Sequence, residues 1–411
     1  MKRYSEYKDS GVKWIGEIPG HWKICRTRYL CNINTGDKDT VMKEDNGKYP
    51  FYVRSPKIER INTFSYDGEA ILMAGDGVGA GKVFHYANGK FDYHQRVYNM
   101  HNICGVSGKF MFYFIRDQFH YAMEEKNAKS TVDSVRLPWL KAFPIAIPAQ
   151  EEQEAIVTYL DTKVAKIDEY ISIAEKKIAA LEELKQTIIA EAVTRGIHKD
   201  VPMKDSGVKW IGEIPGHWDL KRTAMLFSEN RKKNINYEFD HALKFNYGKL
   251  VSKNEIGDVS SLKETYMAYT IINKNDIAIN CLNLNYDFVS QRVAISPQKG
   301  IITSAYLIIT PRQGVEAMYY NYLFKAMDSK KLFHGMGTGI RLTLSFSELK
   351  KQQIPVPLLS EQQEIVTYIE EKVANINQLC QAERSQIEKL KEYKQRLISD
   401  VVTGKVKVTN D

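Results

Sequence analysis

Two stretches of the 411-residue chain carry apolar residues at the spacing of a long, paired helix. In the first stretch, apolar or small residues recur at alternating steps of four and three, and Glu and Lys fill many of the other positions. The positions of this first seam are Leu160, Val164, Ile167, Ile171, Ala174, Ile178, Leu181 and Ile188. Such steps are the heptad signature of helices that pack along their length. The pattern predicts a helix of about 40 residues, or roughly 60 Å at 1.5 Å per residue.

A second seam near the end of the chain repeats this register. Its positions are Ile369, Val373, Ile376, Cys380, Ile387, Leu390 and Leu397. Glu383 and Lys394 interrupt it, so the second seam is more polar than the first. A lone helix would leave its apolar stripe in water, and the nearest partner is the other helix of the same chain. We expect the two helices to pair antiparallel; a coiled coil between two chains is the alternative.

The hydrophobic pattern changes in the two long segments that precede these helices, which we call the first and the second body. Residues 70–73 and 301–309 are apolar runs that predict strands, and Gly, Asn and Asp punctuate the sequence between such runs. Each body closes with a few helical residues and a proline-flanked strand, at residues 143–148 and 353–357. We therefore expect both bodies to be mixed α/β.

An internal repeat sets the order of these parts. The fifteen residues from Lys8 to Trp22 recur letter for letter from Lys204 to Trp218, and they contain four of the five tryptophans. A looser repeat opens each long helix. Its shared residues are Pro148, Glu152, Gln153, Ile156, Val157, Thr158 and Tyr159, which return as Pro357, Glu361, Gln362, Ile365, Val366, Thr367 and Tyr368. Fifteen consecutive identities indicate a duplication.

The fold class that follows is α+β: two mixed α/β bodies, separated by two long helices that form an antiparallel coiled coil, in a pseudo-twofold duplication. The expected domains are the first body with its tryptophan repeat (1–149), the first helix (150–197), the second body with its repeat (198–357), and the second helix with the tail (358–411).

The net charge of +8 is unevenly distributed. Residues 1–150 carry 22 Lys/Arg against 16 Asp/Glu, and residues 204–355 carry 21 against 14. The two segments that contain the long helices are slightly acidic. Two basic bodies suggest two contacts with a polyanion such as nucleic acid, although a solvated surface would also account for this modest excess.

The cysteines and the N-terminal sequence indicate in which cellular compartment the protein is expected. The five cysteines form no C-x-x-C pair, which argues against a disulfide framework or a zinc cluster and favours a reducing environment. The N-terminus lacks the apolar segment of a signal peptide, and no apolar run approaches the roughly 18 residues needed to span a bilayer. We expect a cytoplasmic protein without a membrane partner.

The glycine-rich segment from Gly75 to Lys82 resembles a phosphate-binding loop but departs from its pattern. Asp76 stands where the first glycine is needed, and Val83 replaces the Ser or Thr that follows the lysine. A tight turn between strands is the better interpretation. The histidines of the first body lack metal-ligand spacing. The sequence has no Asn-Pro-Pro-Tyr or Asp-Pro-Pro-Tyr motif of an amino-methyltransferase and no Pro-Asp dipeptide that heads a nuclease carboxylate cluster. We expect no catalytic, cofactor or metal site in this chain.

The duplicated Asp-Ser-Gly-Val-Lys-Trp-Ile-Gly-Glu-Ile-Pro-Gly-His-Trp opening resembles the start of many type I restriction–modification specificity (S) subunits. Each Pro-x-x-x-Glu-Gln-x-x-Ile-Val-x-Tyr helix entry resembles them too, and the combination covers nearly the whole chain. The resemblance implies that each body is a target-recognition domain for one half of a split, asymmetric site in double-stranded DNA. It implies that the helices set the gap and dock two methyltransferase (M) subunits, which restriction (R) subunits join in the full complex.

By the same resemblance, this chain is non-catalytic and the assembled complex has adenine-methyltransferase and ATP-dependent endonuclease activity. S-adenosylmethionine, ATP and Mg²⁺ would then serve the partner subunits.

Amide, hydroxyl and basic side chains in loops are the groups that contact base edges and phosphates. Candidates in the first body are Arg54, Gln95, Arg96, Lys129, Ser130, Thr131 and Arg136. Candidates in the second body are Arg231, Lys232, Lys233, Asn283, Asn285, Gln291, Arg292, Thr338 and Arg341. Gln95-Arg96-Val97 and Gln291-Arg292-Val293 lie 196 residues apart, as the tryptophan repeats do, so we expect them at equivalent places.

Two other functions compete with DNA recognition. An enzyme with its own DNA chemistry would methylate DNA as an isolated chain. A tether whose bodies bind proteins would give a complex whose DNA binding is absent or insensitive to salt.

Overall fold

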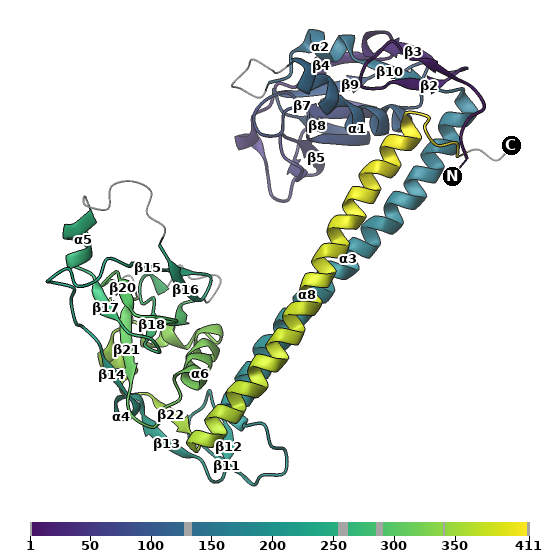
Figure 1. Ribbon diagram of the computed structural model, residues 1–411. Helices are drawn as coiled ribbons and strands as arrows, with labels where there is room; N and C mark the ends of the chain where they lie inside the picture. The colour runs from purple at the N-terminus through teal and green to yellow at the C-terminus, as the bar shows by residue number, and fades with distance from the viewer. Residues whose placement is uncertain (1, 127–133, 254–261, 285–290, 340–341, 409–411) are drawn as a thin grey trace. The chain divides into compact units, whose positions relative to one another are not determined.

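A computed structural model gives the fold and describes residues 2–126, 134–253, 262–284, 291–339 and 342–408 (Figure 1). Its contacts divide the chain into two compact units, Met1–Ala174 with Arg384–Asp411, and Glu175–Glu383. Each long helix therefore contributes one half to each unit. Five candidates for DNA contact lie outside the described residues: Lys129, Ser130, Thr131, Asn285 and Arg341.

The two predicted long helices are present as α3 (Gln150–Arg195) and α8 (Leu359–Val402), of 46 and 44 residues. Acidic side chains occupy the first turn of each helix, where their negative charge interacts favourably with the positive end of the helix dipole. Just beyond each C-terminal end stands a glycine at positive φ, Gly196 at 75° and Gly404 at 73°, which is a common way for a helix to end. In the parts of the chain that are described, no helix is long and apolar enough to cross a membrane.

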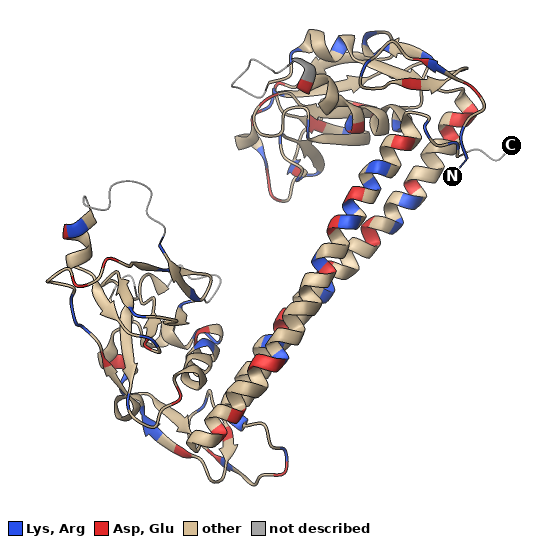
Figure 2. Ribbon diagram, in the orientation of Figure 1, with Lys and Arg blue, Asp and Glu red and all other residues tan. Residues whose placement is uncertain are grey.

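The residues predicted for the two seams are buried or half-buried, while charged residues of both signs follow one another along α3 and α8 (Figure 2). In the second unit, the interrupting Glu383 pairs with Lys177, and Lys185 donates to the Asn377 Oδ1 atom at 3.2 Å. Residue numbers thus rise along α3 as they fall along α8, so the helices run antiparallel in this unit.

In the first unit, the other interruption of the second seam is also paired with the facing helix. The Lys394 Nζ atom lies 2.6 Å from the Asp168 Oδ1 atom. Partly exposed pairs of this kind contribute little to stability, but polar seam positions fix which residues of two helices face each other. These pairs join helices of one chain.

The first unit contains a sheet with the strand order β4-β9-β7-β8-β5-β6, in which only the β5–β8 pair is parallel, and two further strand pairs, β1-β2 and β3-β10. Its strands are β1 (Tyr7–Asp9), β2 (Glu17–Pro19), β3 (Lys23–Arg26), β4 (Asn32–Thr35), β5 (Tyr49–Tyr52), β6 (Glu59–Ile61), β7 (Tyr66–Ala74), β8 (Phe84–Tyr93), β9 (Val97–His101) and β10 (Pro144–Ile147). Helix α1 (Gly108–Lys126) packs on this sheet and joins α3 through Asp161, which accepts from the Tyr113 hydroxyl at 2.8 Å. Helix α2 (Leu137–Ala142) follows.

The second unit contains a sheet with the strand order β14-β21-β18-β19 and the strand pairs β11-β12, β13-β22, β15-β16 and β17-β20. Its strands are β11 (Met203–Asp205), β12 (Glu213–Pro215), β13 (Asp219–Arg222), β14 (Phe227–Glu229), β15 (Leu243–Asn246), β16 (Lys249–Ser252), β17 (Thr270–Ile272), β18 (Ile277–Ile279), β19 (Val293–Ile295), β20 (Gly300–Ile302), β21 (Leu307–Pro311) and β22 (Gln353–Val356). Its shorter helices are α4 (Thr223–Leu226), α5 (Lys263–Met267), α6 (Ala317–Ser329) and α7 (Phe346–Leu349).

The two units share one order of elements. Strands β4-β9-β7-β8 of the first unit have the same neighbours as β14-β21-β18-β19 of the second, and a helix follows β9 and β21 alike, α1 in the first unit and α6 in the second. The predicted closing strands are present as β10 and β22. The predicted strand over residues 301–309 is wrong as a single element, because a turn at residues 303–306 divides it into β20 and β21.

Candidate nucleic-acid interface

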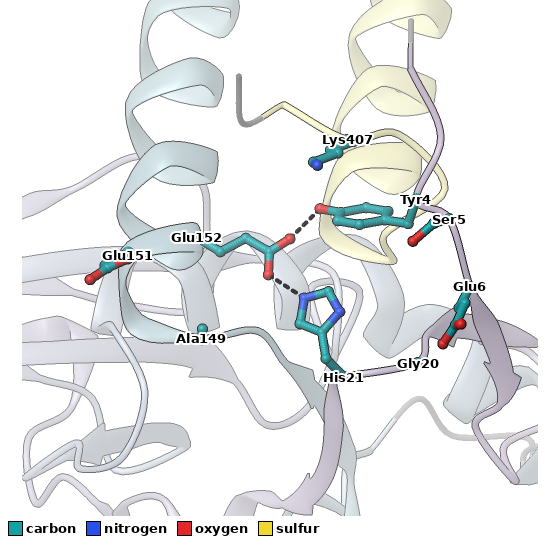
Figure 3. A pocket seen from close by; sticks show the side chains of 9 residues that line it. All are labelled: Tyr4, Ser5, Glu6, Gly20, His21, Ala149, Glu151, Glu152 and Lys407. Carbon is teal, nitrogen blue, oxygen red and sulfur yellow. Dashed lines mark hydrogen bonds and ion pairs between the residues drawn. The ribbon is translucent and has the colours of Figure 1, made fainter. Parts of the chain in front are cut away.

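The exact tryptophan repeat meets the start of a long helix in both units. In the first unit, Glu152 of α3 accepts from the indole N–H of Trp22 at 3.1 Å, and its other oxygen accepts from the Tyr4 hydroxyl. The His21 Nε2 atom lies 2.9 Å from the same carboxylate. Figure 3 shows Tyr4 and His21 directed at Glu152, beside a cavity of about 420 Å³.

The second unit repeats this arrangement at Glu361 of α8. Its carboxylate accepts from the indole N–H of Trp218 at 2.9 Å and lies 2.9 Å from the His217 Nε2 atom. Position 200, which corresponds to Tyr4, is an aspartate. Trp218 and Trp22 are both fully buried, so each indole N–H relies on its glutamate for a hydrogen bond.

The glutamine that follows each glutamate ties the helix to its body. The Gln153 side chain donates to the Pro148 carbonyl at 3.0 Å and accepts from the Ser107 backbone N–H at 2.7 Å. Gln362 does the same with the Pro357 carbonyl and the Glu316 backbone N–H, both at 2.9 Å. The repeats therefore build the junction between body and helix. The repeated Glu-Gln pair is the sequence signal for this role, but repetition alone does not show what the pair contacts.

Replacing Glu152 by alanine should lower the free energy of unfolding by about 1–3 kcal/mol, because it leaves the buried indole N–H of Trp22 without an acceptor. Urea unfolding measures the effect. Glu154→Ala is the matched control. Glu154 is exposed, and among the contacts described it accepts only from Gln150, one helical turn away. Its replacement should change the free energy of unfolding by less than about 0.5 kcal/mol. Equal effects at the two positions would contradict the junction role.

In the first unit, several loops converge on one carboxylate. Asp76, which follows β7, binds the guanidinium groups of Arg54 and Arg96. The Arg54 Nη1 atom is 3.0 Å from the Asp76 Oδ1 atom, and Arg96 binds the other oxygen. We call these three residues the Asp76 cluster. Asp76, which breaks the phosphate-loop pattern in the sequence, thus brings together the two predicted candidates, Arg54 and Arg96.

The electrostatics of the Asp76 cluster keep its carboxyl group ionised. Partial burial alone would raise the pKa of Asp76, but the hydrogen bonds and charges of Arg96 and Arg54 outweigh burial and hold that pKa below its ordinary value. The neighbouring His94 is buried, which lowers its pKa, and its Nδ1 atom accepts from the Arg96 backbone N–H at 3.0 Å. A neutral His94 therefore fixes the backbone of Arg96.

The remaining described candidates of the first body lie on neighbouring segments. Gln95 is exposed and donates to the Asp39 carboxylate at 3.1 Å. Arg136 is exposed at the start of α2 with its guanidinium 5.4 Å from the centre of the Trp139 ring. The Val135 backbone N–H donates to the Gly75 carbonyl at 2.8 Å, so the α2 segment and the Asp76 loop adjoin.

In the second unit, two loops that carry candidates meet in a corresponding way. The β18–β19 loop holds Asn283, and its Cys281 carbonyl accepts from the Leu344 backbone N–H at 3.2 Å. Thr338, which is exposed, pairs with Thr343 in the segment that leads into α7. Gln291 is exposed at the other end of the β18–β19 loop.

The predicted role of Arg292 as a DNA contact has to be corrected. It is only 8% exposed, and its guanidinium donates to the carbonyls of Asn280, Leu282 and Asn283 at 2.6–3.2 Å. A guanidinium buried against its own loop serves to hold that loop, so we withdraw Arg292 as a DNA contact.

The expected equivalence of the two Gln-Arg-Val runs is also wrong. Val97 opens β9, which pairs with β4 and β7, whereas Val293 opens β19, which corresponds to β8. The strand that corresponds to β9 is β21. Loops of different length make the spacing of 196 residues coincidental.

Three candidates follow β14 of the second unit. Arg231 is exposed and pairs with Glu229 at 2.8 Å, and Lys232 lies 3.9 Å from Glu238. Lys233 donates to the Ala268 carbonyl at 3.2 Å. Lys233 also forms a β-bridge with Thr270 of β17, so this residue lies beside β17 rather than in the β18–β19 loop.

The fold defines a duplicated α+β protein whose two bodies each dock on a long helix, and the comparisons with known proteins agree with it. The family described as type I restriction modification DNA specificity domain matches residues 19–183 and 203–389. The chain therefore belongs to the type I restriction–modification DNA specificity family, which supplies sequence recognition rather than catalysis.

Curated relatives support the same family. The chain is 24% identical to the type I restriction enzyme MjaVIII specificity subunit of Methanocaldococcus jannaschii, over 98% of both chains. It is also 24% identical to the EcoDI specificity subunit of Escherichia coli, over 50% of this chain and 49% of that subunit. The chain thus spans about half the length of the EcoDI subunit in this match.

Two solved structures share the fold. One chain, from a study of complex assembly and conformational transition of the type I R-M system, has a TM-score of 0.66 at 13% identity and matches 94% of this chain and 98% of its own length. The HsdS subunit of Thermoanaerobacter tengcongensis has a TM-score of 0.51 at 14% identity and matches 95% of this chain and 98% of its own.

Proposed function

We propose that each body of this specificity subunit recognises one half of a bipartite, asymmetric site in double-stranded DNA. The chain itself performs no chemistry. The two helices pair as an antiparallel coiled coil with pseudo-twofold symmetry and set the gap between the two half-sites. The observation that carries this proposal is the duplicated junction: Glu152 with Trp22 and Glu361 with Trp218 attach two unlike bodies to one helical frame in the same way.

The partners follow from this frame. The repeated junctions and helices offer two equivalent surfaces, which fits two methyltransferase subunits, with restriction subunits joining the full complex. The loops of the two bodies, which differ between the bodies, contact the DNA. S-adenosylmethionine, ATP and Mg²⁺ act on the partner subunits, where the methylation of adenine and the ATP-dependent cleavage take place.

Co-expression with a cognate methyltransferase subunit, followed by base-resolution mapping of adenine methylation, tests the proposal. We expect a motif of two short specified sequences with an unspecified gap of fixed length, and DNA binding that weakens steeply as salt rises. Methylation by the isolated chain, or binding by the complex that does not respond to salt, would reject it.

In the first unit, the first described residues of the chain lie beside the segment that follows α8. The backbone N–H of Lys407 donates to the Lys2 carbonyl at 3.0 Å, and the Tyr7 hydroxyl donates to the Gly404 carbonyl at 3.0 Å. A side chain at Gly404 would clash, because its Cβ atom would lie 2.4 Å from Pro19. In the second unit, the corresponding Gly196 leads directly through a short segment into the second tryptophan repeat.

A circular permutant should therefore fold and recognise the same two half-sites. In this permutant, a short linker joins Asp411 to Met1 and the chain is opened near the exposed Lys199. The new linker connects α8 to the first tryptophan repeat, in place of the opened segment that connected α3 to the second repeat. Circular dichroism and the methylated motif are the measurements. A folded permutant whose complex methylates a different motif would contradict the pseudo-symmetric frame.

A further inference from the structure

The loop from Gly75 to Lys82 presents one apolar side chain to solvent. Val78 at its tip is 91% exposed, although the sheet that carries the loop buries Ala74 almost completely. The glycines serve packing: a Cβ atom at Gly79 would lie 2.5 Å from the Arg54 carbonyl oxygen, and one at Gly75 would lie 2.9 Å from the Tyr98 ring. The loop is therefore pressed against the base of the Asp76 cluster, with Val78 projecting from it.

The Asp76 cluster holds two guanidinium groups in place beside this tip. Arg96 and Arg54 remain 61% and 42% exposed in their side chains, while Asp76 is only 20% exposed. Each arginine binds Asp76 through Nη1, and a guanidinium fork carries five N–H groups in fixed geometry. The cluster has a net charge of +1 and keeps the forks from rotating freely.

We propose that this loop and cluster recognise bases in the major groove of the first half-site, with Arg96 binding guanine, Val78 contacting a thymine methyl group, and Asp76 as a positioning residue. The inference rests on the proposed function and names the chemistry of one of its two recognition surfaces. Asp76 and Val78 are additions to the arginines that the sequence indicated.

The chemistry favours bases over phosphates. A phosphate contact needs positive charge alone, and a carboxylate between the two arginines would weaken it. Guanine instead offers two acceptors, O6 and N7, to a fork whose direction is fixed, and this is the commonest specific contact of arginine with DNA. The only apolar group on the major-groove edges of the bases is the thymine methyl, which is the natural partner of an exposed aliphatic tip.

The second body has no copy of this arrangement among its described residues. At the corresponding β18–β19 loop, the arginine is Arg292, which is buried against its own loop. At these equivalent loops, the described residues of the two bodies thus offer different side chains, as recognition of an asymmetric site requires.

Variants of the full chain in complex with the methyltransferase test the inference by mapping of the methylated motif. Arg96→Ala should relax one guanine position of the first half-site by about 5- to 150-fold in preference and leave the second half unchanged. Arg96→Lys should relax it too, because an ammonium group keeps the charge but loses the fork. Asp76→Asn should relax the same position less. Arg28→Ala, at an exposed arginine stacked on Tyr29, is the control and should leave the motif unchanged.

The tip is tested separately with duplexes in which deoxyuridine replaces single thymines of the mapped first half-site. One such replacement should weaken binding by the wild-type complex severalfold and have little effect on the Val78→Ala complex. Thermal melting of each variant checks folding, and the Val78 test stands even where an arginine variant fails to fold. The inference would be overturned if the Arg96→Lys complex methylated the unchanged wild-type motif. It would also be overturned if each deoxyuridine replacement weakened binding by the wild-type and Val78→Ala complexes equally. A wild-type complex without any bipartite motif would instead reject the proposed function itself.

Discussion

Exchanging residues 24–147 for the corresponding segment of a relative should change one half of the methylated motif completely and leave the other half intact. The segment starts in β3 and ends in β10, and these strands pair with each other, with Ile24 opposite Ala146. Both ends of the exchanged segment thus lie side by side, while the Glu152 junction and α3 stay native. Base-resolution mapping of methylated adenine measures the outcome.

The reciprocal exchange is the matched control. Residues 220–355 start in β13 and end in β22, which pair in the same way, with Leu220 opposite Pro355. This exchange should change only the other half of the motif. If either exchange altered both halves, or neither, while the chimaera remained folded, the two bodies would not be independent recognition modules.

Inserting one heptad into both long helices should lengthen the gap of the recognised site and preserve both half-sequences. Seven residues add about 10 Å of helix, which corresponds to about three base pairs at 3.4 Å each. We place the insertions after Ala174 and after Glu383, where each helix passes from one unit to the other. Both helices need the insertion, because Lys177 faces Glu383 and Asp168 faces Lys394 across the pair.

An insertion of two residues into each helix is the control for this experiment. Two residues rotate the helix by about 200°, which breaks the seven-residue repeat and turns the buried seam away from its partner, so we expect loss of stability rather than a new gap. An active complex that carries the paired heptads and still methylates a motif with the original gap would mean that the helices do not set the distance.

Much of the frame could be predicted because it depends on local periodicity and on repetition. The heptad steps placed α3 and α8 within a few residues, since a helix interior without proline or glycine has no reason to end early. The interruptions at Glu383 and Lys394 could be placed on the seam but not paired, because their partners lie more than 200 residues away in the sequence.

The candidate DNA contacts were less predictable. Residue type alone marked Arg96 and Arg292 equally, yet one is exposed beside Asp76 and the other is buried against three carbonyls. The matching Gln-Arg-Val runs gave a false equivalence, because chain spacing counts residues whereas structural position depends on which strands pair. The pairing of Arg54 with Asp76 joins loops that follow different strands, and no local pattern reports it.

The sequence by itself determined the duplication, the two long helices, the mixed α/β bodies and the family, because repeated or periodic residues indicate each of these features. The tertiary structure decided what the duplicated segments do inside the chain: Glu152 and Glu361 each accept a hydrogen bond from a buried tryptophan in a segment more than 100 residues distant. It also decided which arginines reach solvent. Burial and hydrogen bonding depend on contacts between distant segments, and those contacts exist only once the chain has folded.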